Sequence, residues 1–188
     1  MEVRRLTDFN RIAEIYYSQM QTDFPSNEIK PLIAIENALE NGIYECYGLF
    51  RGRITLGYAF LLRSGSRYLL DYFAILEAYR NKGLGSVFLN RLSKLLSESA
   101  YLICEVDAPD KEKDPELKAR CEKRIQFYLH NGFQQTRVTS CIFGADYRVL
   151  IMPGTEIWDD KEIAESYAAL YKSILPEFFF KNCFSVTL

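Results

Sequence analysis

The sequence is poor in histidine. His130 is the only one among 188 residues, which excludes Ser–His and Cys–His catalytic pairs elsewhere in the chain and argues against a His-rich metal site. The five cysteines are an odd number and include no Cys-x-x-Cys pair, a pattern that suits neither a zinc site nor a disulfide framework. We therefore expect free thiols, a reducing, cytoplasmic setting and no bound metal.

Long apolar runs and a surplus of charge of either sign are also absent. No run reaches the roughly 18 residues that a membrane-spanning helix needs, and the first residues lack the apolar core of a secretion signal. The 23 Lys and Arg nearly balance the 25 Asp and Glu, so the net charge of -2 gives no global attraction to nucleic acid or to anionic membranes. We expect neither as a partner, and any phosphate-binding site has to be local.

The sequence does contain the composition and patterning of a globular α/β protein. Hydrophobic residues make up 48% and charged residues 26%, and the length predicts a single domain over residues 1–188. Short gaps that contain glycine predict antiparallel hairpins in the first half, and the order of elements predicts helices around one mixed central sheet. Strands are expected at 3–6, 43–50, 54–62, 68–75, 101–106, 133–143 and 147–152, and helices from 8 to about 20, at 27–40, 83–97 and 115–131, and from 159 to about 175.

One segment combines glycines with basic residues, between an apolar strand and an amphipathic helix. The first N–H groups of a helix lack internal partners and carry partial positive charge, and glycine lets a phosphate approach them closely. Arg80 and Lys82 add full charges, and Ser86 adds a hydroxyl. The order of Lys82 and Gly83 does not fit a Walker loop, and Phe88 stands where a dinucleotide fingerprint needs glycine. The segment predicts a pyrophosphate cradle, with a plain helix-starting surface turn as the alternative.

Two blocks of the sequence resemble a known family. Arg80-Asn81-Lys82-Gly83-Leu84-Gly85 resembles the Arg/Gln-x-x-Gly-x-Gly/Ala signature of the GCN5-related N-acetyltransferases, the GNAT superfamily. The stretch 124–133, Arg-Ile-Gln-Phe-Tyr-Leu-His-Asn-Gly-Phe, is similar to the family's Phe-Tyr-x-x-x-Gly-Phe helix end. The resemblance in element order covers a core of about 1–152 and leaves 153–188 as a C-terminal helical extension.

This resemblance implies a fold and a co-substrate. The fold is a GNAT-like mixed, mostly antiparallel sheet splayed between strands 4 and 5, and acetyl-CoA is the co-substrate bound in the cleft. Backbone groups of Phe73, Ala74 and Ile75 would bind the acetyl carbonyl and the pantetheine. The Arg80 side chain would hold the pyrophosphate together with the backbone N–H groups of Asn81, Lys82, Gly83, Leu84, Gly85 and Ser86.

Amide formation from a thioester needs an amine without its extra proton and a proton for the departing thiolate. The resemblance implies Tyr128 as the general acid, and an ordinary core tyrosine is the alternative. For the base we favour Asp71, because residues 71, 73 and 75 share one face of a strand. Glu105 and Asp107, at the end of the adjoining strand, are the alternatives, and each of the three carboxylates also fits a solvated strand end.

The expected function is acetyl-CoA-dependent transfer of an acetyl group, directly in a ternary complex, to a primary amine on a small molecule or peptide. The nearby carboxylates favour a cationic amine. Cys121 stands where many relatives carry asparagine, which supports the rival of a non-catalytic acyl-CoA-binding sensor. Arg124 stands where relatives often have a small residue, and it fits a solvated helix face, a CoA phosphate contact or a carboxylate contact. Phe178, Phe179, Phe180 and Phe184 are expected to cover the core, with a homodimer contact or a partner-binding surface as alternatives.

Overall fold

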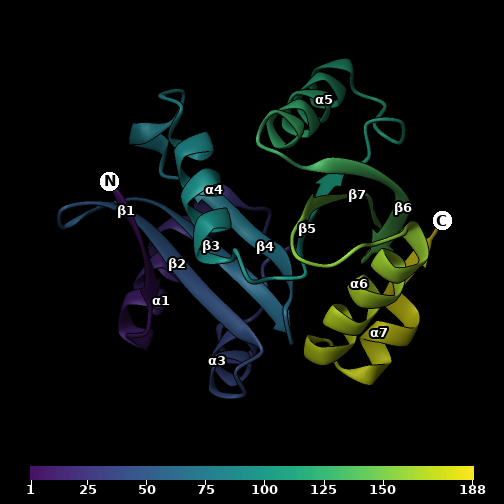
Figure 1. The fold of residues 1–188 in the computed structure, drawn as a ribbon, viewed down its shortest axis with the longest axis horizontal. Coiled ribbons are helices and arrows are strands. Elements are labelled where there is room, and N and C mark those ends of the chain that lie inside the picture. Colours follow the sequence, from purple (N-terminus) through teal and green to yellow (C-terminus); the bar gives the residue numbers. More distant parts are fainter. The chain divides into compact units, whose positions relative to one another are not determined.

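The computed structural model describes residues 1–188 and has strands and helices in alternation (Figure 1). The strands are β1 (Glu2–Leu6), β2 (Tyr44–Arg51), β3 (Ile54–Ser64), β4 (Arg67–Ile75), β5 (Tyr101–Asp107), β6 (Gln134–Ile142), β7 (Ala145–Pro153) and β8 (Phe184–Thr187). The helices are α1 (Phe9–Ile15), a π-helical turn η1 (Tyr16–Met20), α2 (Gln21–Asp23), α3 (Leu32–Glu40), a 3₁₀ turn η2 (Glu77–Tyr79), α4 (Leu84–Leu95), α5 (Pro115–His130), α6 (Asp160–Ile174) and α7 (Glu177–Cys183).

The strand order is β1-β2-β3-β4-β5-β7-β6-β8, and the expected fold class, a mixed and mostly antiparallel sheet with flanking helices and an added C-terminal helix, is confirmed. The chain forms two compact units, of which the first comprises 1–63 and 70–96 and the second comprises 64–69 and 97–188. The division runs through β4, whose residues up to Leu69 belong to the second unit. A single domain over 1–188 stays a prediction.

The first unit is built on antiparallel strands with a strongly apolar interior. β1 pairs with β2 so that Leu6 lies opposite Cys46, and β2 pairs with β3. Aromatic side chains fill this interior because they suit the pleated surface of a buried strand. Tyr44, Tyr58 and Phe60 are fully buried, and the Phe60 ring makes edge contacts with both tyrosine rings.

The second unit contains the antiparallel strands β5, β7, β6 and β8. Figure 1 shows α5 on one side of these strands and α6 with α7 on the other. The helices begin where the sequence provides caps: Asp114 accepts hydrogen bonds from two N–H groups at the start of α5, and Asp159 accepts one at the start of α6. Gly132, with a φ of 92°, follows the end of α5 in the left-handed conformation that glycine tolerates.

The structure corrects the expected helix over 27–40. Helix α3 begins only at Leu32, because the residue before Pro31 is disfavoured in helical conformation and the Tyr72 side chain fixes the preceding backbone. The Tyr72 hydroxyl donates to the Glu28 carbonyl at 2.7 Å and accepts from the Lys30 N–H at 2.8 Å. Strand β8 and helix α7 were not expected, since four strand residues and seven helix residues are too few to produce a readable periodicity.

The Phe-rich tail divides into covered and exposed rings. Phe184 lies against the rings of Tyr167 and Tyr171, and Phe180 stacks on Phe184 at 5.1 Å. Phe178 is 70% exposed, so internal cover describes only part of the tail. A homodimer contact stays a prediction.

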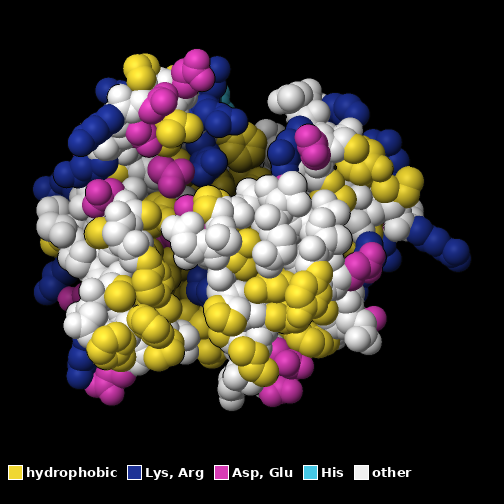
Figure 2. All heavy atoms as spheres, turned by 180° about the vertical axis from the view of Figure 1, so that it is seen from behind, with side chains coloured by type: hydrophobic (Ala, Val, Ile, Leu, Met, Phe, Trp, Pro, Cys, Tyr) yellow, Lys and Arg dark blue, Asp and Glu magenta, His cyan; other side chains and the backbone are white.

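Several surface and thiol features accompany the fold. All five cysteines are free thiols, as expected. None of the helices has the length and apolar character needed to cross a membrane. Acidic and basic side chains intermingle on the face drawn in Figure 2, in keeping with the small net charge.

Candidate functional site

The start of α4 has a backbone conformation that favours anion binding. Gly83 is the N-cap residue in a left-handed conformation, with a φ of 71°, and no side chain caps the helix. Asn81 also has a positive φ, of 60°. Alternating left-handed and right-handed residues turn successive N–H groups toward one concave surface, and the helix dipole adds positive potential there. A Cβ built on Gly83 would meet nothing within 4 Å, so the space on that side of Gly83 is open.

Two cations flank this helix start, as the sequence predicts. The Arg80 Nε donates to the Ile75 carbonyl at 2.9 Å, and its guanidinium pairs with Asp23. The Lys82 ammonium donates to the Ala78 carbonyl at 3.0 Å. Both side chains remain exposed, so their remaining donors reach solvent beside the helix start.

The end of β4 leads directly into this cradle through η2. Phe73, Ala74 and Ile75 are half-buried, and the Phe73 ring lies 5.3 Å from the Phe88 ring of α4. On the neighbouring strand, a Cβ at Gly57 would stand 2.6 Å from the Ala74 carbonyl oxygen, so only glycine allows this close approach. Sequence reasoning missed Gly57, although a lone glycine inside a strand pattern is a recognised sign of close backbone approach.

Asp71, the favoured base, is not a solvated strand-end carboxylate. Its side chain is only 3% exposed and accepts a hydrogen bond from the Lys30 ammonium at 2.7 Å. The Tyr44 hydroxyl donates to its other oxygen, and burial raises the pKa of that hydroxyl well above its usual range. Asp71 therefore accepts hydrogen bonds from two side chains of its own chain. Its role as base stays a prediction. Neither Lys30 nor Tyr44 was singled out from the sequence.

In the second unit, Tyr128 lies on the inner face of α5. Its side chain is buried, and its ring makes edge contacts with Phe127 and Phe133 at 5.3 and 5.1 Å. Burial, followed by the neighbouring Cys104, raises the pKa of its hydroxyl. The hydroxyl makes no hydrogen bond, and the structure has no fully buried side-chain oxygen without a partner, so this oxygen reaches accessible space. Tyr128 thus presents a neutral hydroxyl without a hydrogen-bond partner, and its role as general acid stays a prediction.

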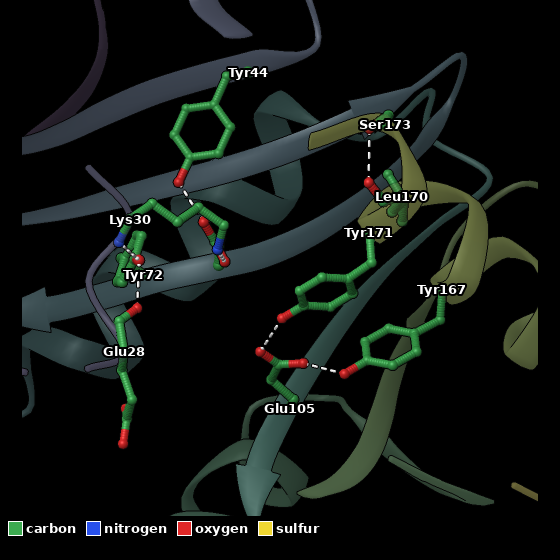
Figure 3. Close-up of polar contacts among 10 residues, drawn as sticks. Glu28, Lys30, Tyr44, Tyr72, Glu105, Tyr167, Leu170, Tyr171 and Ser173 are labelled. Atoms are coloured by element: carbon green, nitrogen blue, oxygen red, sulfur yellow. Dashed lines mark hydrogen bonds and ion pairs between the residues drawn. The ribbon is translucent and has the colours of Figure 1, made fainter. Parts of the chain in front are cut away.

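Glu105, the alternative base, is held by two phenols of the C-terminal extension. The Tyr171 hydroxyl donates to one carboxylate oxygen at 2.6 Å and the Tyr167 hydroxyl donates to the other (Figure 3). Tyr167 also lies 2.9 Å from the Ser140 hydroxyl. As with Asp71, a role for Glu105 as base stays a prediction. Its tyrosine partners could not be found from the sequence because α6 is more than 60 positions away.

Three further residues singled out from the sequence have clear environments. Arg124 pairs with the Asp107 carboxylate at 2.8 Å, so among its alternatives the carboxylate contact is observed. Cys121 is buried, and burial raises the pKa of its thiol, as it does for Cys104. Neither thiol is activated for nucleophilic attack.

Comparison with solved structures finds GNAT acetyltransferases. A chain from Bacteroides thetaiotaomicron assigned to the GNAT acetyltransferase family matches with a TM-score of 0.70 and 17% identity, over 93% of this chain and 97% of that one. The ribosomal-protein-S18-alanine N-acetyltransferase of Escherichia coli matches with a TM-score of 0.59 and 17% identity, over 84% and 96%. An acetyltransferase of Bacillus subtilis in complex with CoA matches with a TM-score of 0.59 and 16% identity, over 82% and 99%.

At this level of identity the similarity establishes the fold, and the expected GNAT fold is confirmed. No protein-family model and no curated protein matches the chain.

Proposed function

We propose that this chain with the GNAT fold is an acetyl-CoA-dependent N-acetyltransferase that transfers the acetyl group directly to a primary amine. The observation that carries the proposal is the uncapped start of α4, where Gly83 opens the backbone and Arg80 and Lys82 add positive charge. A CoA complex among the solved structures of this fold supports it.

Different residues of the chain bind acetyl-CoA and supply the proton. The N–H groups from Asn81 to Ser86, with Arg80, hold the pyrophosphate, and the backbone at 73–75 aligns the pantetheine arm. Acetyl-CoA supplies an acetyl group activated as a thioester. Tyr128 donates the proton that the departing thiolate needs, because its hydroxyl is neutral and unpaired.

The acceptor is a primary amine of a small molecule or a peptide. A cationic acceptor was expected from the carboxylates, but Asp71 pairs with Lys30 and Asp107 pairs with Arg124, so these two acids are already balanced by cations of the chain. We therefore include polyamines, aminoglycosides, amino acids and peptide N-termini equally as candidate acceptors.

The test is acetyl-CoA binding by calorimetry, followed by thiol release across that acceptor panel. Tyr128→Phe is expected to lower turnover by about 10²–10⁴-fold, the usual contribution of a general acid, with unchanged acetyl-CoA affinity. Tyr17→Phe is the matched control, because Tyr17 is 68% exposed. Absence of acetyl-CoA binding contradicts the proposed function, and full turnover of Tyr128→Phe contradicts the assigned acid.

One set of observations favours a second candidate, a non-catalytic acyl-CoA-binding sensor. Asp71 and Glu105 each accept hydrogen bonds from two side chains of the protein, and Cys121 replaces the asparagine that many relatives carry. A sensor binds acetyl-CoA with the same cradle and releases no thiol with any amine of the panel. Binding without release would therefore select this candidate over the enzyme.

A further inference from the structure

Asp23, the last residue of α2, contacts Arg80 of the cradle. Its side chain is only 6% exposed. One carboxylate oxygen accepts a hydrogen bond from the Tyr58 hydroxyl at 2.8 Å, and the other accepts from the Arg80 guanidinium. Burial and the hydrogen bond to Asp23 raise the pKa of Tyr58, so this phenol remains a donor. A single carboxylate thus joins α2, β3 and the loop before α4.

The contacts of Arg80 leave most of its donors unused. Its Nε–H is directed to the Ile75 carbonyl and one terminal N–H to Asp23, whereas a guanidinium has five N–H groups in a rigid plane. The side chain is 46% exposed, so the remaining three N–H groups are available at the surface. A planar fork held along one edge presents its other edge in a fixed orientation, which suits the paired oxygens of a phosphate.

We propose that Asp23 is a positioning residue for the pyrophosphate of acetyl-CoA: it holds the Arg80 fork in the orientation that receives the phosphate oxygens. This inference rests on the proposed function. An exposed arginine without such an anchor samples many rotamers, and binding then has to order it. Asp23 removes that requirement before the co-substrate arrives.

The negative charge of Asp23 repels a phosphate, whereas its hold on Arg80 favours phosphate binding. Experiment can separate these two effects. Asp23→Asn keeps an acceptor oxygen for Arg80 and removes the charge, whereas Asp23→Ala removes both. Because Asp23 is buried against Arg80, salt screens its charge little, and the direction of the change in affinity shows which of the two effects is larger. We expect Asp23→Ala to weaken acetyl-CoA binding on the order of tenfold, within the effect of ordering one arginine side chain, and Asp23→Asn to weaken it less.

The experiment measures the affinity of the full chain for acetyl-CoA and for acetyl-pantetheine, which lacks the pyrophosphate. Positioning through Arg80 predicts a loss with acetyl-CoA and none with acetyl-pantetheine. It also predicts that Asp23→Ala has no further effect when combined with Arg80→Ala. Thermal unfolding of each variant checks that the fold is retained, and Tyr58→Phe, which removes the second anchor of Asp23, gives a smaller loss of the same kind should Asp23→Ala fail to fold.

The outcomes distinguish the two proposals. If the unaltered chain does not bind acetyl-CoA, the proposed function fails. If it binds but Asp23→Ala binds acetyl-CoA equally well, or loses affinity equally for both thioesters or in the Arg80→Ala background, Asp23 does not act through Arg80 and the inference is overturned.

Discussion

Substitution of Gly83 by alanine separates backbone strain from loss of the anion site. Gly83 has a φ of 71°, in the left-handed region where an added Cβ costs about 1–2 kcal/mol. Nothing lies within 4 Å of that Cβ, so no steric clash adds to the strain. For a chain of this length, such a loss lowers the melting temperature by roughly 2–8 °C.

Gly42 provides a control matched in conformation and surroundings. It has a φ of 69°, and its Cβ would also meet nothing within 4 Å. Gly42→Ala and Gly83→Ala should therefore destabilise the fold by similar amounts. Only Gly83→Ala changes the N-cap residue of α4, within the proposed cradle. Since one hydrogen bond to a charged group contributes about 1.5–3 kcal/mol, we expect acetyl-CoA to bind at least about tenfold more weakly.

The assay pairs urea or thermal unfolding with calorimetric titration of acetyl-CoA for both variants. Equal destabilisation with a loss of affinity confined to Gly83→Ala supports the cradle. The reasoning is refuted if the two variants bind acetyl-CoA alike, or if only one of them loses stability. The first result would show that the pyrophosphate does not approach Gly83, and the second that conformation alone does not determine the strain.

Three other predictions follow from close contacts and buried groups. Gly57→Ala should destabilise the fold by about 1–3 kcal/mol in urea unfolding, because its Cβ would stand 2.6 Å from the Ala74 carbonyl oxygen. Lys30→Ala should lower stability by about 3–5 kcal/mol by leaving the buried Asp71 without its cation, whereas Lys161→Ala, at a 75% exposed side chain, should change it by less than about 0.5 kcal/mol. Folding raises the pKa of several thiols and phenols, so the unfolded chain loses their protons at a lower pH than the folded chain does. Stability should therefore fall as the pH rises above about 9, and a stability that stays flat to pH 11 would contradict this. These groups are Cys46, Cys104, Tyr44, Tyr58, Tyr128 and Tyr167.

The elements that could be predicted from the sequence are those whose signal is local. Examples are the stripe of α4, the caps of α5 and α6, and the glycine turns. Each of these features depends on residues only a few positions apart, so their spacing in the sequence is sufficient to predict it. The cradle belongs to the same group, because its glycines, its cations and its helix start are contiguous from 80 to 86. The prediction of helix over 27–31 was wrong, because the helix-like spacing there competes with Pro31 and with hydrogen bonds to the distant Tyr72.

The partners of the candidate site residues could not be predicted, because each comes from a distant part of the chain. Asp23 is 57 positions from Arg80, and Lys30 is 41 positions from Asp71. Periodicity shows which face of an element is buried, but not which buried side chain it meets. The sequence therefore indicated Asp71 as a strand-end carboxylate and could not show that its own chain supplies a cation and a phenol to it.

These partners bear on how the proposed reaction handles its protons. Asp71 and Glu105 each accept hydrogen bonds from two side chains, and protonation of either carboxylate would disrupt bonds that the folded chain already makes. Tyr128 differs, because burial keeps its hydroxyl neutral and no partner has to be displaced when it gives up its proton. Both assignments stay predictions, and they differ in that only Tyr128 has no hydrogen bond to break. An amine that loses its proton to water before it reacts would need only the acid, and the turnover of Tyr128→Phe tests whether Tyr128 is that acid.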